Sequence, residues 1–325
     1  MSSDKPIYIA TRGSALALVQ ANFILGECQR HFPKIPFALK IIKTTGDKMQ
    51  TASLSRIDAT LPRGLFTKEI EEALLNGEAD LAVHSLKDLP TTLPESLKLG
   101  ATPPRADARD VLICHNSKLK TQNSKFSLST LPQGATIATS STRRAAQLLE
   151  KRPDLKIVPI RGNVGTRLQK LADSTELTGT ILAAAGLDRL GYKISANGEL
   201  ENSEFPVPGS ALLATHLSLD EMLPCVGQAA LGIETRENDP HIDSICEKLN
   251  HNDTWNCVVA ERAFLRAMGG GCQSAVGAFA EIIGGQLRLH AVSYLGENAK
   301  RGNLLGEIEH AQRIGEELAN SLKPT

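Results

Sequence analysis

Aromatic residues are scarce in this chain of 325 residues, at 4% of the sequence, and neither sign of charge is in excess. Lys plus Arg and Asp plus Glu both number 36, so the formal net charge is zero. Proteins that bind nucleic acids usually carry a basic excess and aromatic side chains for stacking, so we do not expect a nucleic-acid partner. The hydrophobic fraction of 41% is ordinary for a globular chain of two or three domains.

Long hydrophobic runs and closely paired cysteines are also missing from the sequence. No stretch reaches the roughly 20 apolar residues that span a membrane, and residues 1–10 lack the basic and apolar regions of a signal peptide. Without a Cys-x-x-Cys pair, the cysteines favour neither a zinc site nor a dense disulfide framework. Free thiols are typical of a reducing compartment, so we expect a cytoplasmic protein without a membrane anchor or a metal. The six cysteines are Cys28, Cys114, Cys225, Cys246, Cys257 and Cys272.

The first third of the chain alternates strand and helix patterns. Apolar runs predict strands, and apolar residues spaced by three and four predict helices. Such alternation is typical of a mostly parallel sheet covered by helices. The predicted order is strand 7–10, helix 18–28, strand 37–44, a helix between Thr67 and Asn76-Gly77, and strand 80–86.

A second alternating block begins after Pro103-Pro104, and a third block has a different character. The segments 276–283 and 286–293 flank Gly284-Gly285, which predicts an antiparallel hairpin between helices near 253–267 and 312–322. We interpret residues 197–222 as an irregular surface insertion. The second block has predicted strands at 111–114, 136–139, 157–160 and 180–183, with helices at 143–151 and 164–172.

Polar residues follow the predicted strands where α/β proteins bind ligands, beyond the carboxyl ends of the strands. Ser14 and Ser141 each stand at a helix start, with Arg12 and the pair Arg143-Arg144 close by. Helix N-termini attract anions, and arginine matches a carboxylate in bidentate fashion. Each segment taken alone also fits a plain helix cap with its arginines in solvent.

Further arginines occupy similar places after strands. Arg161 follows one strand directly, Arg167 lies in the next helix, and Arg189 comes after another strand end. Several such arginines in a chain of zero net charge indicate a local basic cleft for a ligand with several carboxylates or phosphates. Unrelated surface charges are the alternative.

Two other segments have the composition of reactive sites. Asp88, beside Lys87 at a strand end, could stabilise a cationic intermediate or move a proton, or could simply cap the next turn. Strand alternation places His84 on the opposite face from Ser85, and we interpret His84 as structural. Cys272 follows three glycines, which suits a reactive thiol and equally an ordinary buried cysteine.

Taken together, the motifs resemble those of the porphobilinogen deaminase family. The resemblance runs in order along nearly the whole chain. It includes Glu261-Arg262 ahead of the cysteine segment and Val226-Gly227-Gln228 before it. The matching phrases are Ala10-Thr11-Arg12-Gly13-Ser14, Gly64-Leu65-Phe66-Thr67-Lys68-Glu69, Ala82-Val83-His84-Ser85-Leu86-Lys87-Asp88, Thr139-Ser140-Ser141-Thr142-Arg143-Arg144, Arg161-Gly162-Asn163-Val164-Gly165-Thr166-Arg167-Leu168, Ala184-Ala185-Gly186-Leu187-Asp188-Arg189 and Gly270-Gly271-Cys272-Gln273.

The resemblance implies an α/β fold of three domains. Two are lobes like those of periplasmic binding proteins, with mostly parallel sheets, and the third is a small α/β domain with an antiparallel sheet. The implied ranges are 1–103 with about 229–247, then 104–228, then 248–325. It also implies a monomeric transferase of heme biosynthesis with no nucleic-acid, membrane or metal partner. The resemblance further implies that four porphobilinogen molecules lose ammonia and join a dipyrromethane primer held by a Cys272 thioether, and that water then releases hydroxymethylbilane.

The family also assigns roles to matching residues. Asp88 matches the catalytic carboxylate, while Phe66 and Arg63 belong to a segment that would cover the site. Substrate carboxylates would be bound by Arg12, Ser14, Ser141, Arg161 and Arg167. The cofactor would be held by Cys272, Lys87, Ser85, Ser140, Arg143, Arg144, Arg189 and Gly186.

Some positions depart from the family pattern. Leu61-Pro62-Arg63 replaces a Gly-Gly-Lys phrase, Ser274-Ala275 replaces an aliphatic residue and proline, and Gln228-Ala229-Ala230 replaces a more glycine-rich phrase. Two alternatives therefore stay open. One is a non-catalytic two-lobed protein that binds anions, and the other is a degenerate deaminase that cannot load its cofactor.

Overall fold

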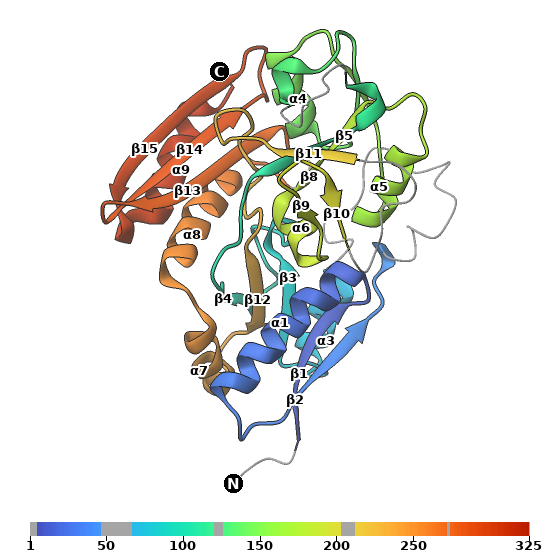
Figure 1. Cartoon of the computed structure of the whole chain (residues 1–325). Coiled ribbons are helices and arrows are strands. Elements are labelled where there is room, and N and C mark those ends of the chain that lie inside the picture. The colour runs from blue at the N-terminus through green and yellow to red at the C-terminus, as the bar shows by residue number, and fades with distance from the viewer. Residues whose placement is uncertain (1–4, 47–66, 120–125, 203–211, 272–273, 325) are drawn as a thin grey trace.

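The computed structural model describes residues 5–46, 67–119, 126–202, 212–271 and 274–324. Their strands form two five-stranded sheets, one three-stranded sheet and a two-stranded ribbon. We name lobe 1 the described residues of 5–101 and 231–249, lobe 2 those of 110–216, and the C-terminal unit those of 252–324. Figure 1 shows lobe 1 below, in blue and cyan with β12 and α7 in dark yellow to orange, lobe 2 in green and yellow above it, and the C-terminal unit in orange and red.

Lobe 1 is a sheet with helices on both faces. Its strand order is β2-β1-β3-β12-β4. Alternate residues of one strand serve the two faces: Ile9 packs with α1 and α7, whereas Ala10 packs with α3. The elements are β1 (Ile7–Arg12), α1 (Ala15–His31), β2 (Phe37–Ile42), α3 (Lys68–Leu75), β3 (Leu81–Ser85), β4 (Leu97–Ala101), β12 (Leu231–Arg236) and α7 (Pro240–Leu249).

Lobe 2 repeats this layered plan. Its strand order is β11-β5-β8-β6-β7, with Leu148 of α4 buried on one face and Leu168 of α5 and Leu187 of α6 on the other. The elements are β5 (Asp110–His115), β6 (Thr136–Ala138), α4 (Thr142–Lys151), β7 (Lys156–Val158), α5 (Val164–Ala172), β8 (Gly179–Ala183), α6 (Ala184–Arg189), β9 (Lys193–Ile194), β10 (Leu200–Glu201) and β11 (Leu212–His216).

Each of the two large sheets has parallel strand pairs in one half and antiparallel pairs in the other. In lobe 1, β1 is parallel to β2 and β3, but β12 is antiparallel to β3 and β4. In lobe 2, β6 is parallel to β7 and β8, but β5 is antiparallel to β8 and β11. The reversal in lobe 1 arises because β12 returns after the chain has built lobe 2.

One segment of the predicted surface insertion at 197–222 is a strand of the sheet. Leu212, Leu213 and Ala214 of β11 are buried and pair with β5, so the prediction is wrong there. Its run of apolar residues fits a strand that is packed on both faces.

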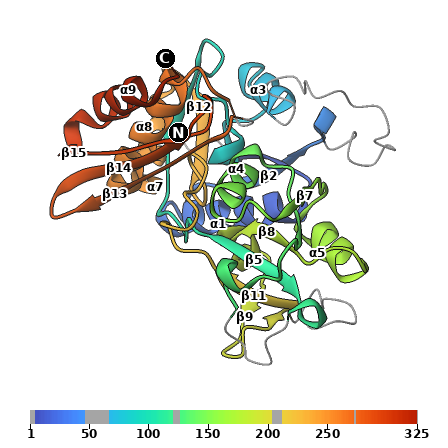
Figure 2. The same cartoon turned by 90° about the horizontal axis from the view of Figure 1, so that it is seen from above.

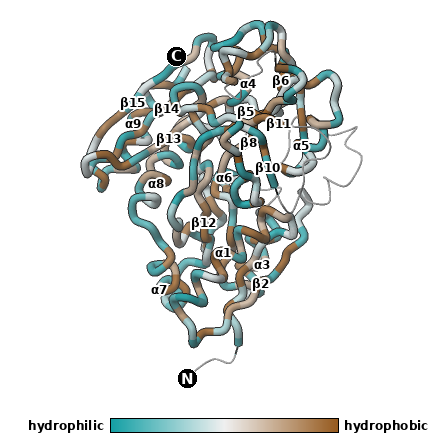
Figure 3. The backbone as a smooth tube through the Cα atoms, in the orientation of Figure 1, coloured by the Kyte–Doolittle hydropathy of each residue, from teal (hydrophilic) through white to brown (hydrophobic). Residues whose placement is uncertain are grey.

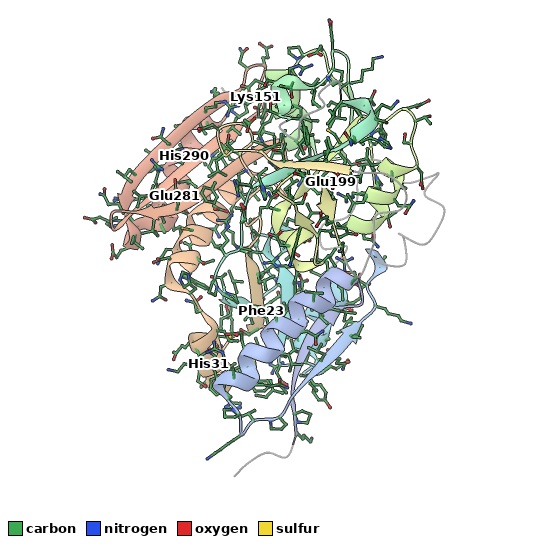
Figure 4. All side chains as sticks on the ribbon, in the orientation of Figure 1. Phe23, His31, Lys151, Glu199, Glu281 and His290 are labelled. Atoms are coloured by element: carbon green, nitrogen blue, oxygen red, sulfur yellow. The ribbon has the colours of Figure 1, made fainter. Side chains whose placement is uncertain are left out.

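The C-terminal unit packs two helices on an antiparallel sheet, in the order β13-β14-β15. Gly284 and Gly285 make the predicted hairpin turn with φ of 57° and 78°, where a side chain would be strained. Figure 4 labels Glu281 and His290 on the two strands of this hairpin, which Figure 2 shows from above. The elements are α8 (Asn252–Ala267), β13 (Val276–Ile283), β14 (Gln286–Ser293), β15 (Lys300–Glu307) and α9 (Ala311–Leu322).

Hydrophobic and hydrophilic stretches alternate along all three units, as Figure 3 shows, in keeping with elements that each bury one side. No helix in the described part of the chain is long and apolar enough to cross a membrane.

A buried carboxylate links the C-terminal unit to the segments that pass between the lobes. Glu261 of α8 is fully buried and accepts hydrogen bonds from Arg105 Nη1 at 2.5 Å and from the Gly227 backbone at 2.8 Å. It also accepts one from the Ala280 backbone of β13 at 2.9 Å. The crossing segments, 102–109 and 217–230, are therefore anchored to a third unit. The domain boundaries given above stay a prediction.

Candidate active site

A polar pocket lies in lobe 1 at the carboxyl ends of β1 and β3. Arg12 is the last residue of β1, and the Ser14 hydroxyl caps α1 by accepting a hydrogen bond from the Ala17 backbone at 3.3 Å. Strand and cap together place a guanidinium and a helix N-terminus at one site, which suits an anion. The lining residues are Arg12, Ser14, Leu16, Ala17, Gln20, Thr67, Val83, His84, Ser85 and Asp88.

Ser85 is fixed in this pocket by a residue that sequence reasoning missed. Gln20 is 3% exposed, and its Nε2 donates to Ser85 Oγ at 2.8 Å, while Ser85 Oγ and Gln20 Oε1 lie 3.1 Å apart. A polar side chain on the otherwise apolar face of α1, beside Ala21 and Ile24, is the signal that could have identified it.

A second pocket shares Asp88 with the first. It is lined by Lys87, Asp88, Cys225, Val226, Leu265, Gly271, Ser274 and Val276. Lys87 and Asp88 belong to a short 3-10 turn that follows β3 directly, and the Asp88 side chain is exposed. Gly227, with φ of 70°, packs against this turn, and a Cβ there would lie 3.2 Å from the Lys87 backbone nitrogen. The glycine thus lets the crossing segment approach Lys87 closely.

Two residues that line the second pocket, Gly271 and Ser274, flank the predicted attachment residue in the sequence. Cys272 itself lies outside the described residues, as do Arg63 and Phe66. Its neighbours Gly271 and Ser274 are joined by two hydrogen bonds: Gly271 N donates to Ser274 Oγ at 3.0 Å, and Ser274 N donates to Gly271 O at 2.9 Å. Ser274, which departs from the family pattern, therefore closes this loop.

Two predicted cofactor ligands are held by a buried carboxylate in lobe 2. Arg143 Nη2 donates to Asp110 Oδ2 at 2.9 Å, and Arg144 Nη2 donates to Asp110 Oδ1 at 2.7 Å. Asp110 is fully buried, and the arginines are 3% and 7% exposed. Burial alone would raise the pKa of Asp110, but the two guanidiniums lower it well below its usual value. The ion cluster fixes both arginines, and Asp110 was not singled out from the sequence.

Neither guanidinium is fully satisfied by this arrangement. Arg143 Nη1 donates to the Leu223 carbonyl at 2.6 Å and Arg144 Nη1 to the Ile181 carbonyl at 3.0 Å. The Nε atoms of both arginines are buried without a hydrogen-bond partner among the described residues. Each arginine therefore keeps one donor and a net share of positive charge in lobe 2.

Arg167 and Asp88 lie within electrostatic reach of each other, although they belong to different lobes. Burial is the main cause that lowers the pKa of Arg167, and repulsion by Arg144 lowers it further, whereas attraction by Asp88 opposes both. Arg167 Nε donates to the Gly162 carbonyl at 2.7 Å. The Asp88 carboxylate of lobe 1 and the Arg167 guanidinium of lobe 2 thus act on each other, as a shared site requires.

The remaining predicted residues of lobe 2 differ in their surroundings. Arg189 donates from Nη2 to the Ala229 carbonyl at 2.7 Å, and burial lowers its pKa. Arg161 is exposed. At Gly186 an added Cβ would only touch a Val164 methyl group at 3.9 Å, so close packing does not require glycine there. Ala229, with φ of 70°, adopts a left-handed conformation where the family has more glycine.

The two serines of lobe 2 have local structural partners. Ser141 caps α4 by accepting a hydrogen bond from the Arg144 backbone at 3.4 Å. Ser140 Oγ donates to the Ile160 carbonyl at 2.8 Å and accepts from the Ile160 backbone at 3.1 Å. Ser140 thereby ties the loop after β6 to the loop before Arg161.

His84 was interpreted as structural, and its surroundings agree with burial. Its side chain is 4% exposed, and its Nε2 lies 3.0 Å from Glu234 Oε2 of β12. It nevertheless lines the first pocket. No group of three His, Cys, Asp or Glu within the described ranges is arranged to hold a metal ion.

Comparison with known proteins identifies the family to which this site belongs. Residues 7–244 match the family model described as "Porphobilinogen deaminase, dipyromethane cofactor binding domain", and residues 255–324 match "Porphobilinogen deaminase, C-terminal domain". Among solved structures, an ancestral cationic amino acid solute binding protein shares 11% identity at a TM-score of 0.41, over 75% of this chain and 88% of that chain.

Curated relatives match over nearly the full length. A porphobilinogen deaminase of Chloroherpeton thalassium is 42% identical over 327 residues, which covers 98% of this chain and 94% of the relative. That of Chlorobaculum tepidum is 43% identical over 323 residues with the same coverage. The chain belongs to the porphobilinogen deaminase family.

Proposed function

We propose that the protein condenses four porphobilinogen molecules, with loss of ammonia, on a covalently held dipyrromethane primer and then releases hydroxymethylbilane. One observation carries this proposal: Asp88 lines both pockets. One pocket has the Arg12 and Ser14 groups that suit a carboxylate, and the other is lined by Gly271 and Ser274, which flank Cys272 in the sequence. A carboxylate at this junction can act on a substrate and on a tethered chain at the same time.

The residues present fit a dipyrromethane. Each pyrrole carries an acetate and a propionate, so the group needs several cations. Lys87 lines the second pocket, while Arg143 and Arg144 keep positive charge in lobe 2. We propose that these three, with Ser85, Ser140, Gly186 and Arg189, hold the cofactor, and that Cys272 anchors it through a thioether. When bound, the cofactor supplies the free pyrrole carbon to which each new unit is added.

Asp88 has the position of the catalytic carboxylate. It is exposed, lines both pockets and lies within electrostatic reach of Arg167 of lobe 2. We propose that it accepts hydrogen bonds from pyrrole N–H groups and stabilises the positive charge that develops as ammonia leaves. Its attraction to Arg167 would keep the two lobes close around the substrate.

Substrate carboxylates would be bound from both lobes. Arg12 and Ser14 line the pocket of lobe 1, and we propose that Ser141, Arg161 and Arg167 approach from lobe 2. We also propose that Arg63 and Phe66 belong to a covering segment. The protein would act as a cytoplasmic monomer in heme biosynthesis, with the three domains bounded at 103/104, 228/229 and 247/248.

The intact mass of the purified protein tests this proposal. The wild type should exceed its sequence mass by one dipyrromethane, and the Cys272→Ser variant should not. Cys225→Ser is the matched control, because Cys225 is a thiol that lines the second pocket and its loss should leave the added mass in place. A wild-type mass equal to the bare sequence after incubation with porphobilinogen would favour a degenerate or purely binding protein.

A further inference from the structure

Three titratable side chains at or near the lobe 1 pocket interact with one another and have no part in the proposed reaction. Glu71 comes from α3, His84 from β3 and Glu234 from β12. His84 lines the pocket, and so does Thr67, the residue that precedes α3. Glu234 contacts His84, and Glu71 lies within electrostatic reach of both, so the cluster adjoins the pocket through His84.

This cluster is buried and incompletely paired. Glu234 is 0% exposed, and its Oε2 lies 3.0 Å from His84 Nε2. Glu234 Oε1 and Glu71 Oε1 are buried without a hydrogen-bond partner among the described residues. A buried carboxylate oxygen without a donor is unfavourable, and a proton on one of the two carboxyl groups relieves it.

The surroundings of Glu71 favour its protonated form. Burial is the main cause that raises the pKa of Glu71, and the negative charges of Glu234 and Glu72 raise it further, against the opposing effects of Thr67 and His84. The cations on the strands packed against α3 are hydrogen-bonded or ion-paired to groups other than Glu71, or line the pocket. Arg236 of β12 donates to the Leu74 and Ala79 carbonyls, Lys98 of β4 pairs with Asp243, and Arg12 of β1 lines the pocket itself.

We propose that Glu71, His84 and Glu234 form a proton-holding cluster that sets how tightly the lobe 1 pocket binds a carboxylate. When Glu71 holds a proton, it adds no charge beside the contact between His84 and Glu234. When Glu71 loses that proton, the cluster gains one negative charge close to the pocket wall to which His84 belongs. That charge repels the substrate carboxylate and offsets part of the attraction of Arg12. Glu71 is thus a positioning residue that acts through the electrostatics of the pocket.

The proposal rests on the proposed function for the identity of the carboxylate, which is that of porphobilinogen. The test compares wild-type holoenzyme with Glu71→Gln, which fixes the neutral form at nearly the same shape. Glu95→Gln is the matched control, because Glu95 is an exposed glutamate of the same lobe and is not among the groups that shift the pKa of Glu71. The ratio of the wild-type KM to the Glu71→Gln KM should be near one in acid. It should rise about tenfold as Glu71 ionises, with kcat little changed, since one added charge near a partly buried site has an effect of about that size.

A titration without turnover provides a second measurement. In protein carrying ¹³C-labelled glutamate side chains, the carboxyl resonance that disappears in Glu71→Gln should titrate at higher pH than the one that disappears in Glu95→Gln. Equal titration of the two, or a KM ratio that does not change with pH, would overturn the proposal while the enzyme still consumes porphobilinogen. Absence of porphobilinogen consumption by wild type and both variants would overturn the proposed function and this inference with it.

Discussion

Lobe 1 and lobe 2 each place a serine-capped helix and nearby arginine at the end of a parallel strand, but they treat the charges differently. In lobe 1, Arg12 lines a pocket, and the carboxylate of the site, Asp88, is exposed. In lobe 2, Arg143 and Arg144 are buried around Asp110, which is 0% exposed. Similar sequence phrases thus lead to an open anion site in one lobe and to a closed ion cluster in the other.

The difference shows that a carboxylate near arginines has two distinct physical roles. Asp110 compensates the charge of two buried arginines, so its role is to stabilise lobe 2. Asp88 lines two pockets, so its role is to interact with a bound ligand. Substitutions that remove only the charge of each aspartate separate these roles.

The largest expected effect is on stability in lobe 2. Asp110→Asn removes the charge that compensates two buried guanidiniums, and we expect a loss of about 3–5 kcal/mol in the free energy of unfolding. Urea denaturation measures it. The control is Asp243→Asn, which breaks the half-exposed pair with Lys98 and should cost at most about 1 kcal/mol. Equal losses in the two variants would contradict the comparison.

Asp88→Asn should have the opposite effect, with a large loss of activity and little loss of stability. We expect kcat for porphobilinogen consumption to fall about 10²–10³-fold, because a preorganised charge that stabilises a developing cation is removed. The free energy of unfolding should change by no more than about 0.5 kcal/mol, since the side chain is exposed. Loading of the cofactor is checked by intact mass, so that a loss of primer is not taken for a loss of catalysis. A strongly destabilised Asp88→Asn would mean that the two aspartates do not differ in role.

Acid should remove the stabilising effect of Asp110. The pKa of Asp110 in the folded protein lies below its value in the unfolded chain, so its contribution is complete above the unfolded value of about 3.9 and is lost as pH falls further. The stability gap between wild type and Asp110→Asn should therefore be constant near neutral pH. It should shrink by about 2–3 kcal/mol in acid, as measured by urea denaturation at several pH values. A gap independent of pH would exclude an ionised Asp110.

Local sequence patterns predicted an element correctly where a capping or turn residue stands next to a periodic run of apolar residues. The helix predicted at 164–172 is α5 at the same residues, because the Asn163 side chain caps it by accepting from the Thr166 backbone. The hairpin around Gly284-Gly285 was predicted for the same kind of reason. Strand β15 was missed, since its half-exposed positions give a weak alternation at the edge of the sheet.

Partners that are distant in the sequence could not be predicted. Asp110 is 33 residues from Arg143, and Glu234 is 150 residues from His84, so no local pattern joins them. The same holds for β12, which pairs with β3 only because the chain returns from lobe 2. The sequence therefore indicated which residues carry the chemistry, whereas the tertiary structure determines which of them are open to a ligand.

The smallest expected effects concern the two capping serines. Ser14→Ala and Ser141→Ala each remove one hydrogen bond at a helix N-terminus, at 3.3 Å and 3.4 Å, and should each cost about 1 kcal/mol of stability. If both helix starts also bind substrate carboxylates, both variants should raise the KM for porphobilinogen severalfold. Denaturation and steady-state kinetics on the same samples separate the two effects. A Ser141→Ala variant that loses stability with an unchanged KM would remove Ser141 from the substrate site. Arg143 and Arg144 would then be the residues after β6 that serve the site, and Ser141 would only cap α4.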